Sequence, residues 1–126
     1  MHRSRFAGII IDCQGADVER AAAFWSRALG YPTLPSTDPA DAAYVRLETA
    51  PRDLHVEVQE VEHPSRVHLD IEADDVEAEV RRLEKLGARR VEQVRSWWVM
   101  EAPTGHRFCV VQAQGAGFAE TAKEWE

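Results

Sequence analysis

The chain has 126 residues and is acidic, because 15 Lys and Arg stand against 22 Asp and Glu, a formal net charge of −7. An acidic surface without a basic stripe repels a phosphate backbone, so nucleic acid is excluded as an expected partner. No apolar run approaches the length of a membrane span, and the N-terminus lacks the apolar stretch of a signal peptide. Two isolated cysteines, Cys13 and Cys109, predict neither a disulfide framework nor a zinc ribbon, and a reducing cytoplasm fits them best.

The first half of the chain predicts one helix and several strands. "FAGIIIDC" (6–13) is typical of a strand, and Asp17 is expected to cap a helix that Gly30 ends. Further strands are predicted at "AAYVRLE" (42–48) and "LHVEVQEV" (54–61), with a short edge strand at "YPTL" (31–34). The intervening "LPSTDPAD" (34–41) is predicted to be a loop and "APRD" (50–53) a turn. The helix's apolar stripe comprises Val18, Ala21, Ala22, Trp25 and Leu29.

The second half predicts the same order of elements. "RVHLDIEA" (66–73) alternates as a half-buried strand does, and Asp74 is expected to cap the next helix, with Glu77 completing a capping box. Gly87 ends that helix. Strands follow at "RRVEQV", "WWVMEAP" and "FCVVQA", the last two joined by a "PTGH" turn. The helical stripe comprises Val76, Val80, Leu83 and Leu86.

An internal repeat underlies this symmetry. "DVE" at 17–19 recurs 58 residues later at 75–77, and "LG" at 29–30 recurs 57 residues later. We therefore predict one domain of two βαβββ modules, at about 5–61 and 66–113, joined by "VEHPSR" (61–66). The tail at 114–126 either docks through Phe118 and Trp125 or frays as a polar terminus.

Residues 5–113 resemble the vicinal oxygen chelate superfamily, which contains glyoxalase I, bleomycin-resistance proteins and extradiol dioxygenases. The resemblance lies in "HLDIEADDVEAEVRRLEKLGA" followed by "WWVMEAPTGHRFCVV", with "FWSRALGY" in the first module. It is strongest to the small glyoxalase-like members. It implies an α+β fold in which tandem βαβββ modules form a curved mixed sheet around a cleft, and it implies a homodimer.

The resemblance also assigns positions for metal ligands. His68 falls where the metal enzymes carry a histidine, and Cys109 falls where they carry a glutamate. In the first module, Glu57 or Gln59 falls at the corresponding last-strand position, whereas the first-strand position, near Ala7 or Gly8, has no ligand. The set that the resemblance supplies is therefore His68, Glu57 and Cys109.

Each candidate also has a simpler interpretation. We favour a hydrogen-bonded cleft residue for His68 and a small buried hydrophobe for Cys109 over metal ligands, whereas a solvated charge and a role in the cleft explain Glu57 equally well. Asp70, on the same face as His68, either holds one tautomer of the imidazole or lines the cleft as a further candidate for ligand contact. Trp97 and Trp98 point to opposite faces of their strand, and we expect Trp98 to line the cleft. The remaining candidates for ligand contact share one face of the first module's strand, Tyr44 and Arg46.

Three hypotheses follow. The first is a protein that binds, and sequesters or modifies, a small aromatic or hydrophobic molecule in a cleft lined by Trp98, Tyr44, His68 and Glu57, with no cofactor required. The second is an enzyme in which a divalent metal ion (nickel, zinc, iron or manganese) polarises vicinal oxygens, making it a lyase, isomerase or dioxygenase. The lack of a ligand in "FAGIII" counts against the second. The third is an interaction module whose cleft its own side chains fill.

Overall fold

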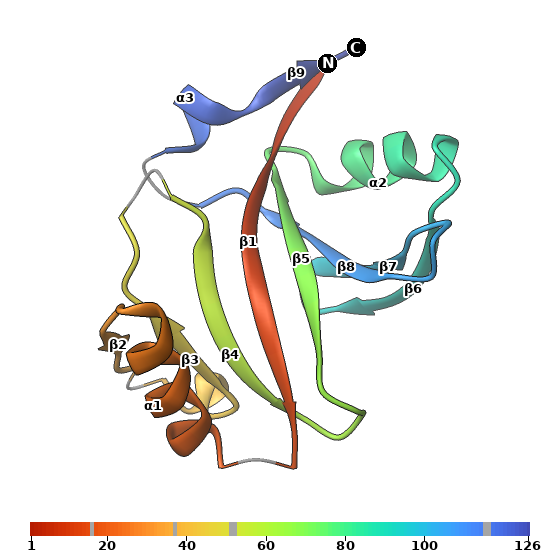
Figure 1. Cartoon of the computed structure of the whole chain (residues 1–126). Coiled ribbons are helices and arrows are strands. Elements are labelled where there is room, and N and C mark those ends of the chain that lie inside the picture. The colour runs from red at the N-terminus through yellow and green to blue at the C-terminus, as the bar shows by residue number, and fades with distance from the viewer. Residues whose placement is uncertain (16, 37, 51–52, 115–116) are drawn as a thin grey trace. The chain divides into compact units, whose positions relative to one another are not determined.

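A computed structural model describes residues 1–15, 17–36, 38–50, 53–114 and 117–126 of the chain (Figure 1). The predicted α+β fold with two βαβββ modules is confirmed. No helix within the described ranges is both long and apolar enough to cross a membrane. The elements are β1 (His2–Gln14), α1 (Val18–Leu29), β2 (Thr33–Leu34), a 3₁₀ turn (Pro39–Asp41), β3 (Tyr44–Leu47), β4 (His55–Val61), β5 (Arg66–Ala73), α2 (Val76–Lys85), β6 (Arg89–Val94), β7 (Trp97–Glu101), β8 (Arg107–Gln112), α3 (Phe118–Thr121) and β9 (Lys123–Trp125).

The described chain divides into two compact units, and β1 contributes to both. The first unit is Gly8–Val67, and the second unit is Met1–Ala7 together with His68–Glu126. In the first unit the strand order is β2-β3-β4-β1, with β4 parallel to β1 and the other pairs antiparallel. In the second unit β5 is parallel to β8, β7 lies antiparallel between β8 and β6, and β9 pairs antiparallel with the start of β1. Each unit therefore contains a mixed sheet. The predicted turn at 50–53 falls partly outside the described residues, at 51–52.

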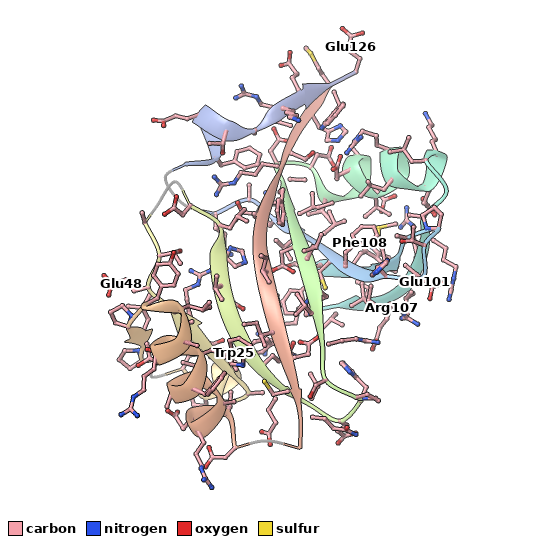
Figure 2. The ribbon with its side chains drawn as sticks, viewed as in Figure 1. Trp25, Glu48, Glu101, Arg107, Phe108 and Glu126 are labelled. Atoms are coloured by element: carbon pink, nitrogen blue, oxygen red, sulfur yellow. The ribbon has the colours of Figure 1, made fainter. Side chains whose placement is uncertain are left out.

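Helix α1 covers one face of the sheet in the first unit. Its N-cap is Asp17, as predicted, because the carboxylate accepts a hydrogen bond from the backbone N–H of Glu19 at 3.0 Å. Gly30 ends the helix with φ 81°, a left-handed conformation that suits glycine. The core beneath the helix comprises Val18, Ala22, Val45 and Val58, against which Cys13, Ala21 and Trp25 pack. Figure 2 labels Trp25 on this helix.

Helix α2 covers the sheet of the second unit, but its cap differs from the prediction. Asp75 caps the helix by accepting from the backbone N–H of Ala78 at 3.0 Å. The carboxylate of Asp74 instead accepts from the backbone N–H of Arg3 at 2.8 Å, because the start of β1 passes beside it. The predicted stripe residue Leu86 is the C-cap and is 66% exposed. The core beneath α2 comprises Ala73, Val80, Leu83, Met100, Phe108 and Val110.

The C-terminal tail docks on the second unit. Strand β9 pairs with His2–Ser4, and the indole Nε1 of Trp125 donates to Ser4 Oγ at 2.8 Å. The guanidinium of Arg82 lies 3.8 Å from the centre of the Trp125 ring, a cation–π contact. Of the two interpretations of the tail, the docked one therefore describes the residues from 117 onward.

Candidate metal and ligand site

Strand alternation gives the second unit a polar face opposite α2. In β5, Ile71 and Ala73 contact the core under α2, so His68 and Asp70 point to the other side of the sheet. The register places Asp70 beside Cys109 and Cys109 beside Val99, and partners in register share a face. We call this side of β5, β8 and β7 the polar face of the second unit.

Three metal-donor side chains meet on the polar face. One potential donor atom each from His68, Asp70 and Cys109 lies within 4.8 Å of the other two. The His68 Nε2 and Asp70 Oδ1 atoms are 3.8 Å apart, and these side chains are 15% and 13% exposed. Cys109 is 9% exposed. The sequence predicted His68 and Cys109 as ligands but gave Asp70 only a supporting role. Its position two residues after His68 on a strand was the available signal, since residues at that spacing share a face.

The chemistry of this donor set fits a borderline or soft divalent cation. An imidazole nitrogen and a thiolate sulfur are ligands that Zn²⁺, Fe²⁺, Co²⁺ and Ni²⁺ accept, whereas Mg²⁺ and Ca²⁺ prefer oxygen. A carboxylate as the third donor is common in zinc sites. His68, Asp70 and Cys109 could therefore hold such an ion with coordination positions left for water or a ligand.

The structure reverses the predicted placement of the two tryptophans. Trp98 packs against the core under α2, and the guanidinium of Arg90 lies 4.9 Å from its ring centre. Trp97 is opposite Val94 and on the same side of β7 as Val99, so it belongs to the polar face. The sequence could not decide between the two tryptophans because "WWVM" places apolar residues on both faces of the strand. The register with β8 determines which tryptophan lies on which face of the sheet.

The candidates from the first module lie together on one face of the first unit. Tyr44 is opposite Gln59 and Arg46 is opposite Glu57, on the side of the sheet away from α1. Arg46 Nη2 and Glu57 Oε1 form an ion pair at 3.2 Å. Contact of Tyr44 or Arg46 with a ligand, and coordination of a metal by Glu57, stay predictions.

The strand register within each unit also shows which residues of the two modules correspond. The N-caps Asp17 and Asp75 are 58 residues apart, which is also the separation of Asp12 from Asp70. Asp12 pairs with Gln59 as Asp70 pairs with Cys109. By the same offset the counterpart of His68 is Ile10, rather than the predicted Ala7 or Gly8. Ile10 offers no donor atom, and within the described ranges the triad occurs in the second unit alone.

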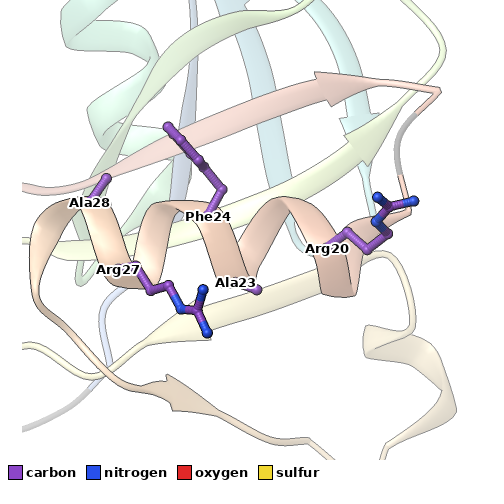
Figure 3. A pocket seen from close by; sticks show the side chains of 5 residues that line it. All are labelled: Arg20, Ala23, Phe24, Arg27 and Ala28. Atoms are coloured by element: carbon purple, nitrogen blue, oxygen red, sulfur yellow. The ribbon is translucent and has the colours of Figure 1, made fainter.

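A different hollow lies on the outer side of α1. Its lining consists of Arg20, Ala23, Phe24, Arg27 and Ala28, all on this helix (Figure 3). Phe24 is 62% exposed there, in edge-to-face contact with Trp25 at 5.0 Å between ring centres. An open depression on one helix does not enclose a small molecule as a ligand site does.

Comparison with known proteins agrees with this architecture. A family model described as a glyoxalase-like domain matches residues 8–111. No curated protein matches the chain. Among solved structures, a hypothetical protein from Bacillus halodurans has a TM-score of 0.64 at 12% identity, over 90% of this chain and 97% of that one.

Two further solved structures have assigned activities. Methylmalonyl-CoA epimerase from Mycobacterium tuberculosis has a TM-score of 0.63 at 13% identity, over 86% of this chain and 88% of that one. A 2,2',3-trihydroxybiphenyl 1,2-dioxygenase from Sphingomonas wittichii has a TM-score of 0.59 at 12% identity, over 90% of this chain but only 42% of that one. At these identities the similarity is one of fold.

Proposed function

This chain belongs to the glyoxalase-like domain family, and from that premise we propose that it is a metal-binding protein that captures a small molecule. The ion is a borderline or soft divalent cation held by His68, Asp70 and Cys109 on the polar face of the second unit. The observation that carries this proposal is the convergence of the three donor atoms within 4.8 Å. Three such side chains on neighbouring strands are costly to desolvate together unless a cation or mutual hydrogen bonding compensates for them.

Each residue of the polar face has a distinct task in this proposal. When bound, the ion supplies Lewis acidity that polarises an oxygen of the captured molecule. His68 Nε2 and Asp70 Oδ1, 3.8 Å apart, would bind the ion from neighbouring coordination positions, and the carboxylate oxygen of Asp70 that the ion leaves free can accept a proton from a bound molecule. Val99 and Trp97, on the same side of β7, provide an apolar surface for the rest of the molecule. Conversion of the bound molecule by a lyase, isomerase or dioxygenase reaction is the enzymatic form of this proposal.

A metal-free binding protein is the second candidate. It is favoured by the low exposure of Cys109, at 9%, which is the ordinary state of a structural cysteine. In this case His68 and Asp70 only line the site as polar side chains, and binding relies on apolar burial. The predicted homodimer applies to both candidates and is checked by light scattering on the purified chain.

Metal titration separates the candidates. We expect stoichiometric Co²⁺ binding, with the near-ultraviolet charge-transfer absorption that a thiolate ligand produces. Cys109→Ser should abolish that band, and His68→Ala should weaken binding by about 100-fold or more, since loss of a supporting contact alone costs 10- to 100-fold.

Cys13→Ser is the matched control. Cys13 lies in the first unit, where burial and then the charge of Asp12 raise the pKa of its thiol and disfavour the thiolate. The control variant should keep the band. A wild-type chain that shows no cobalt band, and no change in melting temperature with saturating Zn²⁺, Co²⁺ or Ni²⁺, would refute the metal site and leave the metal-free candidate.

A further inference from the structure

A row of three charged side chains, Arg89, Glu101 and Arg107, lies at one end of the polar face, and we call it the charge ladder. Arg89 Nε donates to Glu101 Oε2 at 2.9 Å, and Arg107 Nε lies 3.4 Å from Glu101 Oε1. Figure 2 labels Arg107 and Glu101 near the connection between β7 and β8. The register places Glu101 opposite both Arg89 and Arg107, so all three side chains are on the polar face. Two guanidinium groups share one carboxylate, and the ladder has a net charge of +1.

The corresponding ladder of the first unit is balanced. By the alignment of the two modules, Glu57 corresponds to Arg107 and Arg46 to Glu101, so the ion pair is present in both with its polarity reversed. In the first unit the pair is one Arg with one Glu. The second arginine, Arg89, is therefore an addition particular to the second unit.

The other charges of this edge do not cancel the excess. Glu92 is opposite Val99 and exposed, and Arg95 lies with its guanidinium 5.9 Å from the ring centre of Trp97. With these included, β6, β7, the start of β8 and the turn at Arg95 carry three arginines and two glutamates on this side. Arg89 is 62% and Arg107 is 32% exposed, so both can reach a ligand from solvent.

The ladder is also close to the metal-donor triad. Arg107 is two residues from Cys109 on the same side of β8, a separation of about 6.6 Å along a strand. Val99 lies beside Cys109. Among the described residues, the ion pair of Arg107 is with Glu101, and a guanidinium has five N–H donors, so donors are left for a second carboxylate.

We propose that the molecule captured on the polar face is a carboxylate, whose anionic group completes the ladder between Arg107 and Arg89 while its body lies over Val99 and Cys109. The inference deepens the proposed function and rests on it. In the metal-bound state, the thiolate of Cys109 and the carboxylate of Asp70 balance the two positive charges of the ion. The selectivity for an anion therefore still comes from Arg107 and Arg89.

Benzoate and its neutral isostere benzamide are the probes for this test. Each is titrated into ¹⁵N-labelled protein, once freed of metal by chelation and desalting, and once with one equivalent of Zn²⁺. We expect benzoate to shift the amide resonances of Val99, Cys109 and Arg107 and benzamide to shift them far less. Arg107→Gln and Arg89→Gln should each weaken benzoate binding by about tenfold, the loss of one charge-assisted hydrogen bond.

Arg81→Gln is the control, because Arg81 is a 71% exposed arginine on α2 that pairs with Glu77 and should leave benzoate binding unchanged. Melting temperatures of all variants verify that each is folded. Equal chemical-shift changes from benzoate and benzamide, or equal benzoate affinity of the Arg107→Gln and Arg81→Gln variants, would overturn the carboxylate inference, whether or not zinc binds. Failure of zinc to bind, with benzoate selectivity retained, would overturn the metal site and support the anion site alone.

Discussion

Glu79→Gln tests how a buried carboxylate holds the second unit together. The Glu79 side chain on α2 is 0% exposed and accepts from His2 Nε2 at 2.8 Å and from Arg82 Nε and Nη2 at 2.8 and 2.9 Å. Burial acts to raise the pKa of Glu79, but hydrogen bonds from Arg82, His2 and Ser4 outweigh it and hold the pKa below its ordinary value. The native state therefore depends on the charged form.

The expected loss of stability follows from these contacts. Glutamine keeps one acceptor oxygen but places an NH₂ group against donors, so a charge-assisted bond worth about 1.5–3 kcal/mol is lost and a buried donor is unsatisfied. Arg82 is 24% exposed, so water can hydrate its guanidinium once the ion pair is lost, and this limits the loss of stability. We expect the free energy of unfolding at pH 7 to fall by about 3 kcal/mol.

The pH dependence has a definite sign. Because the native pKa of Glu79 is below its unfolded value, the native state binds fewer protons, and the stabilisation is complete above the unfolded value of about 4.5. It is lost as the pH falls through the native pKa. The difference between wild type and Glu79→Gln should therefore narrow below about pH 4.5.

Urea unfolding followed by circular dichroism at pH 7 and in acid measures this difference. Glu77→Gln is the control on the same helix: hydrogen bonds from Arg90 and Arg81 also lower the pKa of Glu77, but its side chain is 44% exposed. Solvent screening limits its effect to about 1 kcal/mol or less. If Glu79→Gln destabilises no more than Glu77→Gln at pH 7, or if its effect does not narrow in acid, the reasoning is refuted.

Two further substitutions test the core and a turn, with stability measured by thermal and urea unfolding. Val80→Ala removes two methyl groups from a 0% exposed site and should cost about 2–3 kcal/mol, whereas Val67→Ala, at a 56% exposed site, should change stability by about 0.5 kcal/mol or less. Gly87→Ala should cost about 2 kcal/mol, because φ is 108° and a Cβ would lie 3.0 Å from Pro103 Cγ. Gly30→Ala, with φ 81° and open space, should cost about 1 kcal/mol, and an equal loss at the two glycines would contradict the steric argument.

The order of helices and strands could be predicted from the sequence because each module carries the same local signals, such as helix caps and glycines that end helices. Asp17 and the glycines at 30 and 87 act through contacts within a few residues, so the chain encodes them without knowledge of the fold. Asp74 and Asp75 are adjacent and equally suited to cap α2. The choice between them depends on Arg3, 71 residues away, which binds Asp74.

The candidate site was predictable only where one strand determines it. His68 and Asp70 share a face by alternation alone, and the predicted position of His68 on the polar side of its strand agrees with the structure. Meeting Cys109 requires the register between β5 and β8, and the choice of Trp97 over Trp98 requires the register between β7 and β8. Both are long-range properties, which a window of sequence does not contain.

The two modules share the same arrangement of strands and helix, but they place different side chains around one equivalent position in that arrangement, an aspartate in the first strand. In each, an aspartate lies five residues before the N-cap and pairs with the neighbouring parallel strand: Asp12 with Gln59, and Asp70 with Cys109. Both aspartates are buried, with 2% and 9% of the whole residue exposed, so burial of an acid at this position is common to the two modules and is not evidence of a metal. The neighbours of the aspartate differ, because among the described residues an imidazole and a thiol join the acid in the second unit alone. The metal hypothesis therefore depends on His68 and Cys109, and Asp70 alone would not support it.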